Sequence, residues 1–468
     1  MMGRREVGQG QFFYSFDLDK VVPPDHLVRQ IDAVLDLSWV HKELSSFYSH
    51  TGRPSIDPVL MLRMLVVGYV FAIRSERRIC AEVQVNLAYR WFCKLGIEDQ
   101  IPDHSVFSRA RNERFRESNA LRRVFEGVVA ACIGAGLVGG EAFSIDASLI
   151  KADVDKKKRA PGDRPIAWPK PEEASRVVRE YLAVLDAARS EEENSTGDNG
   201  GSSGGGSRRK PPKEVSLTDP QASWVARSGM AAFFAYDANY LIDNKAGIIL
   251  DAEGTRATHI EEVDIAQTML ERVARCFGLR PQRLAGDTTY GVARMLKWLL
   301  DRAITPHIPV DKSAQADGKF SRTDFAFDRE RNVYICPAGK LLIHAGAVDQ
   351  GRILPYRASK RDCAICKLKP QCTTSIARKV SRDIDEDMRE QVRALANTEA
   401  FQQSRRERKK IEMRFAHMKR ILKLDRLRLR GLNGAKDEVL LTATAQNLRR
   451  LAKLLYRTPP PMPAACFA

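Results

Sequence analysis

The chain lacks a hydrophobic run long enough to cross a membrane. Its most apolar stretch, residues 58–73, is interrupted by Arg63 and falls short of the roughly 20 residues that a span needs. We therefore interpret it as a buried helix and expect no membrane partner. No apolar segment follows Arg4 and Arg5 near the N-terminus, so no secretory signal is visible and a cytoplasmic location is expected.

Cysteine is scarce, with nine residues in a chain of 468. An odd number scattered over this length argues against a disulfide framework and indicates reduced thiols. Five of them are interpreted as buried or incidental thiols: Cys80, Cys93, Cys132, Cys276 and Cys466.

Acidic residues are outnumbered. The chain has 76 lysines and arginines against 59 aspartates and glutamates, which leaves a formal charge of +17. This excess favours a polyanionic partner, with nucleic acid as the first candidate. A basic protein without such a partner is the alternative that composition leaves open.

The length predicts roughly two to four domains, of which the first, residues 1–135, should be helical. Asp57 followed by Pro58 is typical of a helix start, with an N-cap acid and a proline in the first turn. Further helices are expected over residues 75–95 and from Asp103.

The helix from Asp103 carries three arginines that we take as candidate DNA contacts: Arg109, Arg111 and Arg114. A series of short helices whose last helix is basic is typical of a helix-turn-helix DNA-binding domain, although the connection between the helices is longer here than the usual tight turn. Arginines on an ordinary solvated surface are the alternative.

Residues 136–310 are expected to hold the first part of an α/β core. Strand-like runs end at Asp146 and Asp287, and between them come a hairpin and a helix, over residues 232–250 and 261–277. A helix and a strand follow, over residues 292–303 and 304–310. This order, with a third acid on a late helix, matches the ribonuclease-H-like (retroviral-integrase-like) core with a mixed sheet.

A basic insertion, residues 155–216, interrupts this order. It contains a helix near residues 172–189 and a Gly- and Ser-rich linker from Asn194 to Lys213, which we expect to be disordered. Its cations suit a loose DNA clamp, and a merely tolerated insertion is the alternative.

Residues 311–393 show few helix signals and are interpreted as a small inserted subdomain. Cys336, Cys363, Cys366 and Cys372 form the pattern C-x26-C-x2-C-x5-C, whose C-x2-C pair has the spacing of a structural Zn²⁺ site. Four reduced thiols in a small core are the alternative, and His344 is a candidate to replace one thiolate.

Residues 394–468 should complete the core and end in an amphipathic helix over residues 437–456. Before that helix, Arg408, Glu412 and Lys419 share one helical face, because residues four and seven apart stack together. This face combines an acid that can hold a metal with cations that can hold phosphates. The alternative is a solvated salt-bridge surface.

Asp146, Asp287 and Glu412 are thus candidate catalytic metal ligands. Two carboxylates about 4 Å apart repel by roughly 4 kcal/mol at an effective dielectric near 20, so a cluster of three calls for divalent cations. Oxygen ligands suit Mg²⁺ or Mn²⁺, and two such ions can activate an attacking oxygen and stabilise the leaving oxygen of a phosphodiester. Taken singly, Asp146 is equally an ordinary strand-end acid and Asp287 a turn or capping residue.

Two tryptophans and a histidine have two interpretations each. Trp224 and Trp298 can stack on a flipped base or pack in the core. His417 can shuttle protons or touch phosphate, or it can be an ordinary packing residue.

Together these motifs resemble the DDE transposases of bacterial insertion sequences, in the branch whose glutamate helix carries Tyr-x2-Arg-x3-Glu-x6-Lys. Arg408, Glu412 and Lys419 match this signature, whereas Arg405 stands at the tyrosine position, so any DNA contact of that tyrosine does not carry over. The segments that resemble the family are its helical N-terminal domain, its two acidic motifs and two further stretches: residues 57–116, 143–148, 286–291, 219–224 and 444–448.

The resemblance implies a mobile element's own transposase, which binds the terminal inverted repeats and catalyses Mg²⁺-dependent DNA cleavage and strand transfer. It implies transposon ends and target DNA as partners, a homodimer or higher multimer on DNA, and a bacterial cytoplasm with nucleoid association. Arg408 and Lys419 should then contact the DNA backbone beside the metal ligands. The alternatives are a catalytically inactive, transposase-derived DNA-binding protein and a ribonuclease-H-like nuclease without strand transfer.

Overall fold

The computed structural model describes residues 16–49, 51–52, 55–195, 211–226, 229–310, 319–346 and 351–456. By its contacts the chain divides into two compact units. Unit 1 comprises Met1–Leu137, His417–Lys423 and Leu440–Ala468, and unit 2 comprises Val138–Ala416 and Leu424–Val439. Two helices, α16 (Lys409–Arg420) and α17 (Gly431–Leu455), begin in unit 2 and end in unit 1.

The N-terminal part of unit 1 is helical. Its α-helices are α1 (Leu18–Val21), α2 (Leu27–Asp32), α3 (Val40–Leu44), α4 (Pro58–Val70), α5 (Glu76–Val85), α6 (Leu87–Phe92), α7 (His104–Ala110) and α8 (Ala120–Gly134). The helix start predicted at Asp57 is confirmed, because Oδ1 of this residue accepts the Val59 N–H at 2.7 Å and Pro58 opens α4. Most of α4 is buried, as its apolar sequence predicts.

The helical stretch expected over residues 75–95 is present, but Asn86 divides it. This residue has an extended backbone (φ −99°, ψ 112°), and its side chain accepts the N–H groups of Ala88 and Tyr89. Asparagine side chains compete with the helical hydrogen bonds of the backbone and favour caps. Two helices, α5 and α6, therefore replace one.

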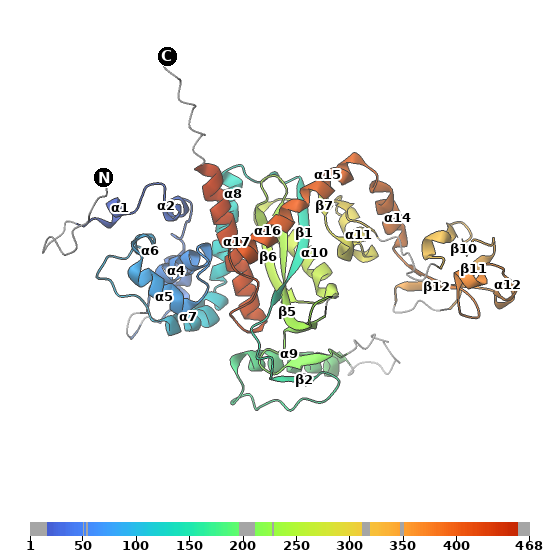
Figure 1. Cartoon of the computed structure of the whole chain (residues 1–468), viewed down its shortest axis with the longest axis horizontal. Helices are drawn as coiled ribbons and strands as arrows, with labels where there is room; N and C mark the ends of the chain where they lie inside the picture. The colour runs from blue at the N-terminus through green and yellow to red at the C-terminus, as the bar shows by residue number, and fades with distance from the viewer. Residues whose placement is uncertain are drawn as a thin grey trace, which may run out of the picture. The chain divides into compact units, whose positions relative to one another are not determined.

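Unit 2 contains a mixed sheet, as expected (Figure 1). Its strands are β1 (Ala142–Lys151), β4 (Ser223–Val225), β5 (Phe233–Asp243), β6 (Ile249–Arg256), β7 (Arg283–Ala285) and β8 (Thr305–His307). The strand order is β4-β5-β1-β7-β8, and β6 also pairs with β5. β5 is antiparallel to β1 and β6, whereas β7 is parallel to both β1 and β8.

Helices cover both faces of this sheet (Figure 1). Tyr240 lies in register with Asp146, and its ring stacks on Phe415 of α16 with centroids 4.9 Å apart, so α16 covers this face. Arg272 of α10 (His259–Phe277) pairs at 3.0 Å with Glu253 of β6, whose side chain alternates to the other face. The helix expected over residues 261–277 is therefore present and covers the face away from Asp146.

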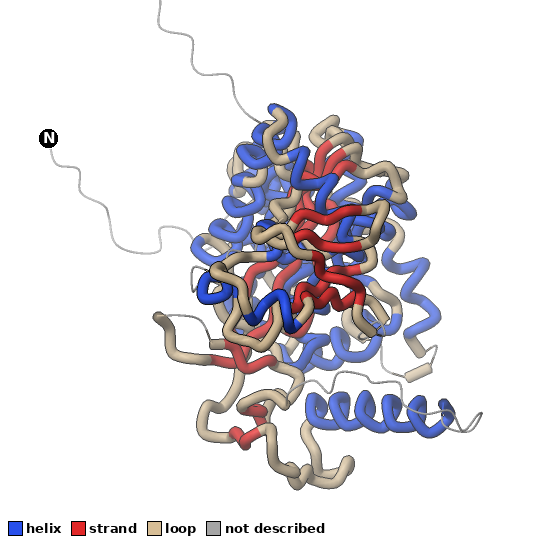
Figure 2. The backbone as a smooth tube through the Cα atoms, turned by 90° about the vertical axis from the view of Figure 1, so that its right-hand side faces the viewer, coloured by secondary structure: helices blue, strands red, loops and turns tan. Residues whose placement is uncertain are grey.

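A shorter helix, α11 (Ala293–Leu300), connects β7 to β8. The inserted segment before β4 forms the two-stranded pair β2 (Arg159–Pro161) and β3 (Glu214–Ser216), with the long helix α9 (Arg176–Ser195) at the lower edge of Figure 2. Most of the linker expected from Asn194 to Lys213 lies outside the described residues, as does the C-terminal tail after residue 456.

A second sheet follows in the segment interpreted as an insertion. It is antiparallel in the order β13-β12-β11-β10-β9, with β9 (Ala326–Asp328), β10 (Val333–Ile335), β11 (Leu341–His344), β12 (Ile353–Ala358) and β13 (Lys379–Asp383). Its small core contains Phe325, Tyr334, Leu342, Tyr356 and Val380. The short helices α12 (Lys360–Ala364) and α13 (Lys369–Cys372) precede β13, and α14 (Glu386–Leu395) and α15 (Glu399–Glu407) lead back to α16.

Within the described ranges, no helix combines the length and the apolar character that a membrane crossing requires.

The contact of β6 with the start of α17 leaves no room for a side chain at Gly254. A Cβ atom there would lie 2.9 Å from the carbonyl carbon of Ala435 and 2.9 Å from the backbone nitrogen of Lys436. We expect Gly254→Ala to lower the free energy of unfolding by about 1–3 kcal/mol, because backbone must move to relieve the overlap. Urea denaturation measures this loss.

Gly127→Ala is the matched control, because nothing lies within 4 Å of its Cβ position in α8. It should be neutral or stabilising by up to about 1 kcal/mol. Equal effects of the two substitutions would contradict the close approach.

Candidate functional site

Asp146 and Asp287 lie on neighbouring parallel strands. The pairing of β1 with β7 places Ser144 opposite Ala285, and each aspartate comes two residues later in the same strand direction. Asp287 keeps an extended backbone (φ −86°, ψ −177°) beyond the last paired residue. Because side chains alternate and neighbouring strands are about 4.8 Å apart, the two carboxylates project from the same face and lie close together.

Asp146 does not end its strand, contrary to the sequence interpretation. β1 continues for five residues and still pairs with β5 at Lys151, opposite Ala235. β5 is long enough to pair with the residues that follow Asp146. The acid therefore sits inside a strand that is held on both edges.

Arg408, at the junction of α15 and α16, forms an ion pair with Asp146. Its Nη2 lies 2.9 Å from Oδ2 of Asp146, with exposed side-chain fractions of 25% and 15% respectively. Burial raises the pKa of the Asp146 carboxyl, the Arg408 guanidinium opposes that rise, and the nearby Asp287 carboxylate adds to it. The guanidinium thus supplies the positive charge that the acid pair needs.

Asp287 also caps the short 3₁₀ turn Thr288–Tyr290. Its Oδ1 accepts the Thr289 N–H at 2.9 Å, and its Oδ2 accepts the Thr289 hydroxyl at 3.3 Å. The capping role weighed from the sequence is therefore present. It does not exclude a ligand role, because each carboxylate oxygen has a second lone pair.

Glu412 lies one helical turn beyond Arg408 and is exposed. Residues four apart on a helix have Cβ atoms about 5–6 Å apart, so Glu412 lies near a residue that touches Asp146. Among the described residues, however, no three His, Cys, Asp or Glu side chains gather closely enough to hold a metal ion. The structure brings two of the three predicted acids together and leaves the third nearby.

The donor set fits a hard divalent cation. Two carboxylates meet on one face, and the cation beside them is a guanidinium that a side-chain rotation can withdraw. Tyr240 and Phe415, which no sequence motif singled out, hold α16 against this face. The apolar positions of α16 at Ile411, Phe415 and Met418 were the available signal.

The three N-terminal arginines differ in position. Arg109 is exposed at the end of α7, and Arg114 lies over the Tyr48 ring at 4.3 Å. Arg111 is 5% exposed and forms an ion pair with Glu76 of α5. The expected DNA contact of Arg111 is therefore wrong for this conformation, because its guanidinium joins two helices inside unit 1.

The four cysteines of the predicted zinc pattern line one small cavity of about 30 Å³. Cys336 opens a tight turn in which its Sγ accepts the Lys340 N–H at 3.3 Å, and Gly339 takes φ +72°. Burial raises the pKa of Cys372, and the other three thiols raise it further. His344 is exposed against Tyr356 and does not line the cavity.

Two further predicted residues lie in unit 1, at the end of α16. His417 shares a hydrogen bond of 3.1 Å with the Gln446 amide, which is a packing role. Lys419 is half-buried.

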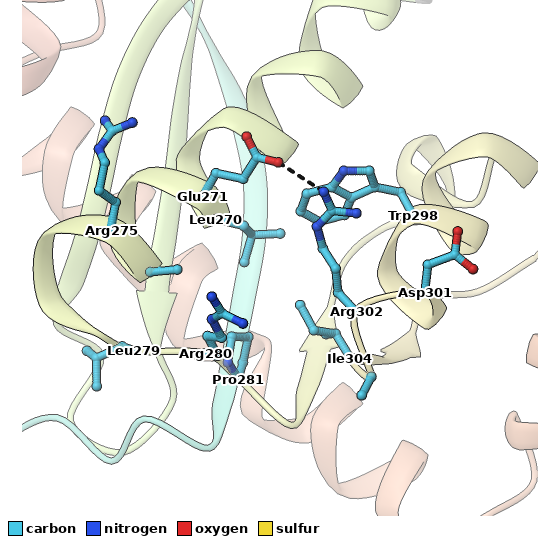
Figure 3. A pocket seen from close by; sticks show the side chains of 12 residues that line it. Leu270, Glu271, Arg275, Leu279, Arg280, Pro281, Trp298, Asp301, Arg302 and Ile304 are labelled. Carbon is cyan, nitrogen blue, oxygen red and sulfur yellow. Dashed lines mark hydrogen bonds and ion pairs between the residues drawn. The ribbon is translucent and has the colours of Figure 1, made fainter.

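A cavity of about 650 Å³ lies away from the acids, and Figure 3 shows its lining. It opens between α10 and α11 and reaches Pro281 and Ile304, at the ends where β7 and β8 begin. Trp298 lines it, with the Arg302 guanidinium 4.0 Å from the ring centroid and paired with Glu271. The acids are at the opposite ends of these parallel strands, so this cavity does not belong to their site.

Two family models match separate parts of the chain. Residues 16–113 match a transposase domain (DUF772), and residues 335–452 match a transposase DDE domain. No curated protein matches the chain. A solved piggyBac transposase synaptic complex with hairpin DNA is similar at 11% identity over 92% of this chain and 78% of that chain, but its TM-score of 0.29 does not establish a shared fold. The family matches support a DDE-type transposase.

Arg408→Ala tests the ion pair. We expect a loss of about 1–3 kcal/mol in the free energy of unfolding, because a half-buried carboxylate loses its partner. Burial and Asp287 would then raise the Asp146 pKa further. An acid whose pKa is raised by folding loses stability as the pH rises through that pKa, so the loss should be larger at about pH 8 than at about pH 5.

Arg405→Ala is the control, because Arg405 is an exposed cation one turn earlier. Its effect should stay within about 0.5 kcal/mol at either pH. A pH-independent loss in Arg408→Ala would contradict the electrostatic role.

Proposed function

We propose that the chain is a DNA transposase that cleaves DNA at the terminal inverted repeats of its own element and transfers the strand ends to a target. The observation that carries this proposal is the adjacency of Asp146 and Asp287 on the parallel strands β1 and β7. The transposase family matches at both ends of the chain support it.

The topology supports a ribonuclease-H-like core. Without the short strand β4, the five strands follow one another in the chain as β1, β5, β6, β7 and β8. In space their order across the sheet is β6-β5-β1-β7-β8, that is 3-2-1-4-5. Only the second strand runs antiparallel to the first, third and later ones. The acids then lie on the first strand, after the fourth strand and on a late helix, as the sequence order predicted.

Asp146, Asp287 and Glu412 are the proposed ligands of two Mg²⁺ or Mn²⁺ ions. When bound, such ions would neutralise the phosphodiester and lower the pKa of an attacking water or 3′ hydroxyl. Asp146 and Asp287 supply a fixed pair of oxygen donors, because β1 and the cap of the 3₁₀ turn hold them. Glu412 would complete the set from its position four residues beyond Arg408, whose guanidinium contacts Asp146.

Arg408 has two roles in this proposal. In this conformation it neutralises Asp146. With cations held by the acids, the guanidinium would be available to a DNA phosphate, which is the role that we propose for Arg408 and also for Lys419. A guanidinium suits this change because its fork recognises carboxylate and phosphate oxygens alike.

The domain division follows from the same assignment. Residues 1–135 bind DNA with Arg109 and Arg114, and residues 311–393 form the cysteine-containing subdomain. Residues 136–310 form the catalytic core together with those parts of residues 394–468 that belong to unit 2, whereas residues 417–423 and 440–468, also expected in the core, belong to unit 1. Two DNA ends need a homodimer or higher multimer, and the site of action is the bacterial nucleoid. An alternative is a catalytically inactive DNA-binding derivative, which the absence of a complete three-acid cluster among the described residues favours.

The catalytic test uses duplex DNA that carries the inverted repeats flanking the gene. We expect Mg²⁺-dependent nicking and strand-transfer products, and a loss of at least about 10³-fold in Asp146→Asn, Asp287→Asn and Glu412→Gln, since each removes one charged ligand oxygen. Gel analysis of labelled DNA measures both products.

Glu399→Gln, an exposed acid on the neighbouring helix α15, is the matched control and should retain activity. Cleavage without joined products would leave a nuclease without strand transfer. Equal activity in wild type and Asp287→Asn would exclude the catalytic assignment, and DNA binding without cleavage would favour the inactive derivative.

The cysteine cluster is proposed as one structural Zn²⁺ site. Four thiols line a cavity close to the volume of one ion or water, and its lining also includes three cations and one acid: Lys340, Lys369, Arg378 and Asp362. In this conformation no three of the thiols stand at metal-binding distance. Small side-chain rotations within the turn at Cys336 and the loop at Cys366 would close the set.

Protein purified without added zinc should contain about one zinc per chain, because four cysteines complete a tetrahedral site. Cys363→Ser should remove most of the metal and lower the melting temperature, whereas Cys276→Ser, an exposed thiol outside the cluster, should change neither. Elemental analysis and thermal unfolding measure these outcomes. Wild-type protein that contains no zinc and melts at the same temperature as Cys363→Ser would contradict the site.

A further inference from the structure

A basic cavity of about 400 Å³ lies at the far end of β1, within unit 2. Its lining includes four cations and no acid: Lys151, Lys156, Arg159 and Arg426. Its floor and wall are aromatic, from Trp224 of β4 and from Phe233 and Phe234 of β5. The volume lies within the range of about 300–1,000 Å³ that is common for small-ligand sites.

The cations are arranged around the rings. Arg159 lies 5.5 Å from the Trp224 ring centroid, and Lys151 lies 5.7 Å from that of Phe233. Trp224 meets Phe234 edge to face at 4.8 Å, which fixes its plane. Aromatic and cationic groups thus alternate around one hollow, so a base and a phosphate can be held together.

Two of these cations also have acidic neighbours. Arg159 lies 3.9 Å from Glu214, and Arg426 lies 3.6 Å from Asp153. Both acids stand outside the cavity lining. Lys151 and Lys156 therefore leave an excess of positive charge facing the hollow.

The cavity and the acid site share strand β1. Lys151 follows Asp146 by five residues on the same strand, which is roughly 17 Å at the usual rise. A parallel bridge joins Lys151 to Arg426, where the Leu427 N–H donates to the Lys151 carbonyl at 2.8 Å. Because side chains alternate along a strand, Lys151 and Asp146 project from opposite faces of the sheet, so this hollow is a site separate from the acids.

The other tryptophan-lined cavity lacks these features. Trp298 lies at the opposite ends of the parallel strands, and acids line its cavity together with arginines (Figure 3). Arg302 lies closer to the Trp298 ring, at 4.0 Å, than Arg159 does to the Trp224 ring, at 5.5 Å, and its acidic partner Glu271 is part of the cavity lining. Of the two tryptophans singled out in the sequence, Trp224 alone faces a hollow lined by cations without acids.

We propose that this cavity binds an unpaired nucleotide of the DNA strand, with its base against Trp224 and Phe233 and its phosphates beside Lys151, Lys156, Arg159 and Arg426. The inference rests on the proposed function, and it identifies the part of the substrate that this second site holds. A base must leave the duplex to enter, so the site favours distorted or single-stranded DNA.

The test measures binding of full-length protein in EDTA, without cleavage. The probes are fluorescent (dT)8, a labelled blunt duplex of arbitrary sequence, and free thymidine monophosphate as competitor. Trp224→Ala should weaken (dT)8 binding about tenfold or more and duplex binding less than about twofold, because stacking acts on unpaired bases. Trp224→Phe should retain most of the affinity.

Trp298→Ala is the matched control and should bind (dT)8 like wild type. Lys156→Ala, at an exposed position, should lower the slope of log affinity against log salt by about 0.7 for the single strand. Thermal unfolding shows whether each variant is folded.

Folded Trp224→Ala and Lys156→Ala variants that both bind (dT)8 like wild type would overturn the assignment. The assignment would also be overturned if thymidine monophosphate displaced (dT)8 at an equal concentration, because the cavity would then be a site for a free nucleotide. Asp146→Asn separates the two proposals, because it should abolish cleavage and leave (dT)8 binding intact. If the wild-type protein binds (dT)8 through Trp224 but does not cleave DNA, the nucleotide site is supported and the proposed catalytic function is rejected.

Discussion

The pairing of β1 on both of its edges is the constraint on which the site depends. β5 holds one edge in antiparallel register from Phe143 to Lys151, and β7 holds the other in parallel register up to Ser144. A shift of β7 by one residue would turn Asp287 to the opposite face and separate the acids. The geometry of the acid pair is thus a property of the whole sheet rather than of local loops.

The sequence predicted the elements that have a clear period or a clear start. The cap at Asp57, the hairpin of β5 and β6, and helix α10 all appear, because each depends on residues close together in the chain. The break at Asn86 was missed because an asparagine in an amphipathic stretch is visible only when its side chain is seen to cap. The length of β1 was missed because its end is set by pairing with β5, which lies about 90 residues away.

The sequence indicated which residues belong to the candidate site, but not which of them contact one another. A four-residue spacing joined Arg408 to Glu412 on one helix, yet Arg408 pairs with Asp146, 262 residues earlier in the sequence. The buried place of Arg111 was invisible for the same reason, because its partner Glu76 belongs to another helix. Basic residues at Arg426, Arg428 and Arg430 alternate as in a strand, but nothing local indicates that they meet Lys151.

The two helices that begin in unit 2 and end in unit 1 make the N-terminal unit discontinuous in sequence. Leu448 and Leu451 of α17 are buried and belong to unit 1 together with residues from its N-terminal helices. A fragment that stops at Leu137 would lack these side chains and expose the apolar surface that they fill. During synthesis, unit 1 is therefore completed only after the segments of unit 2 have emerged, so the two units mature together rather than one after the other.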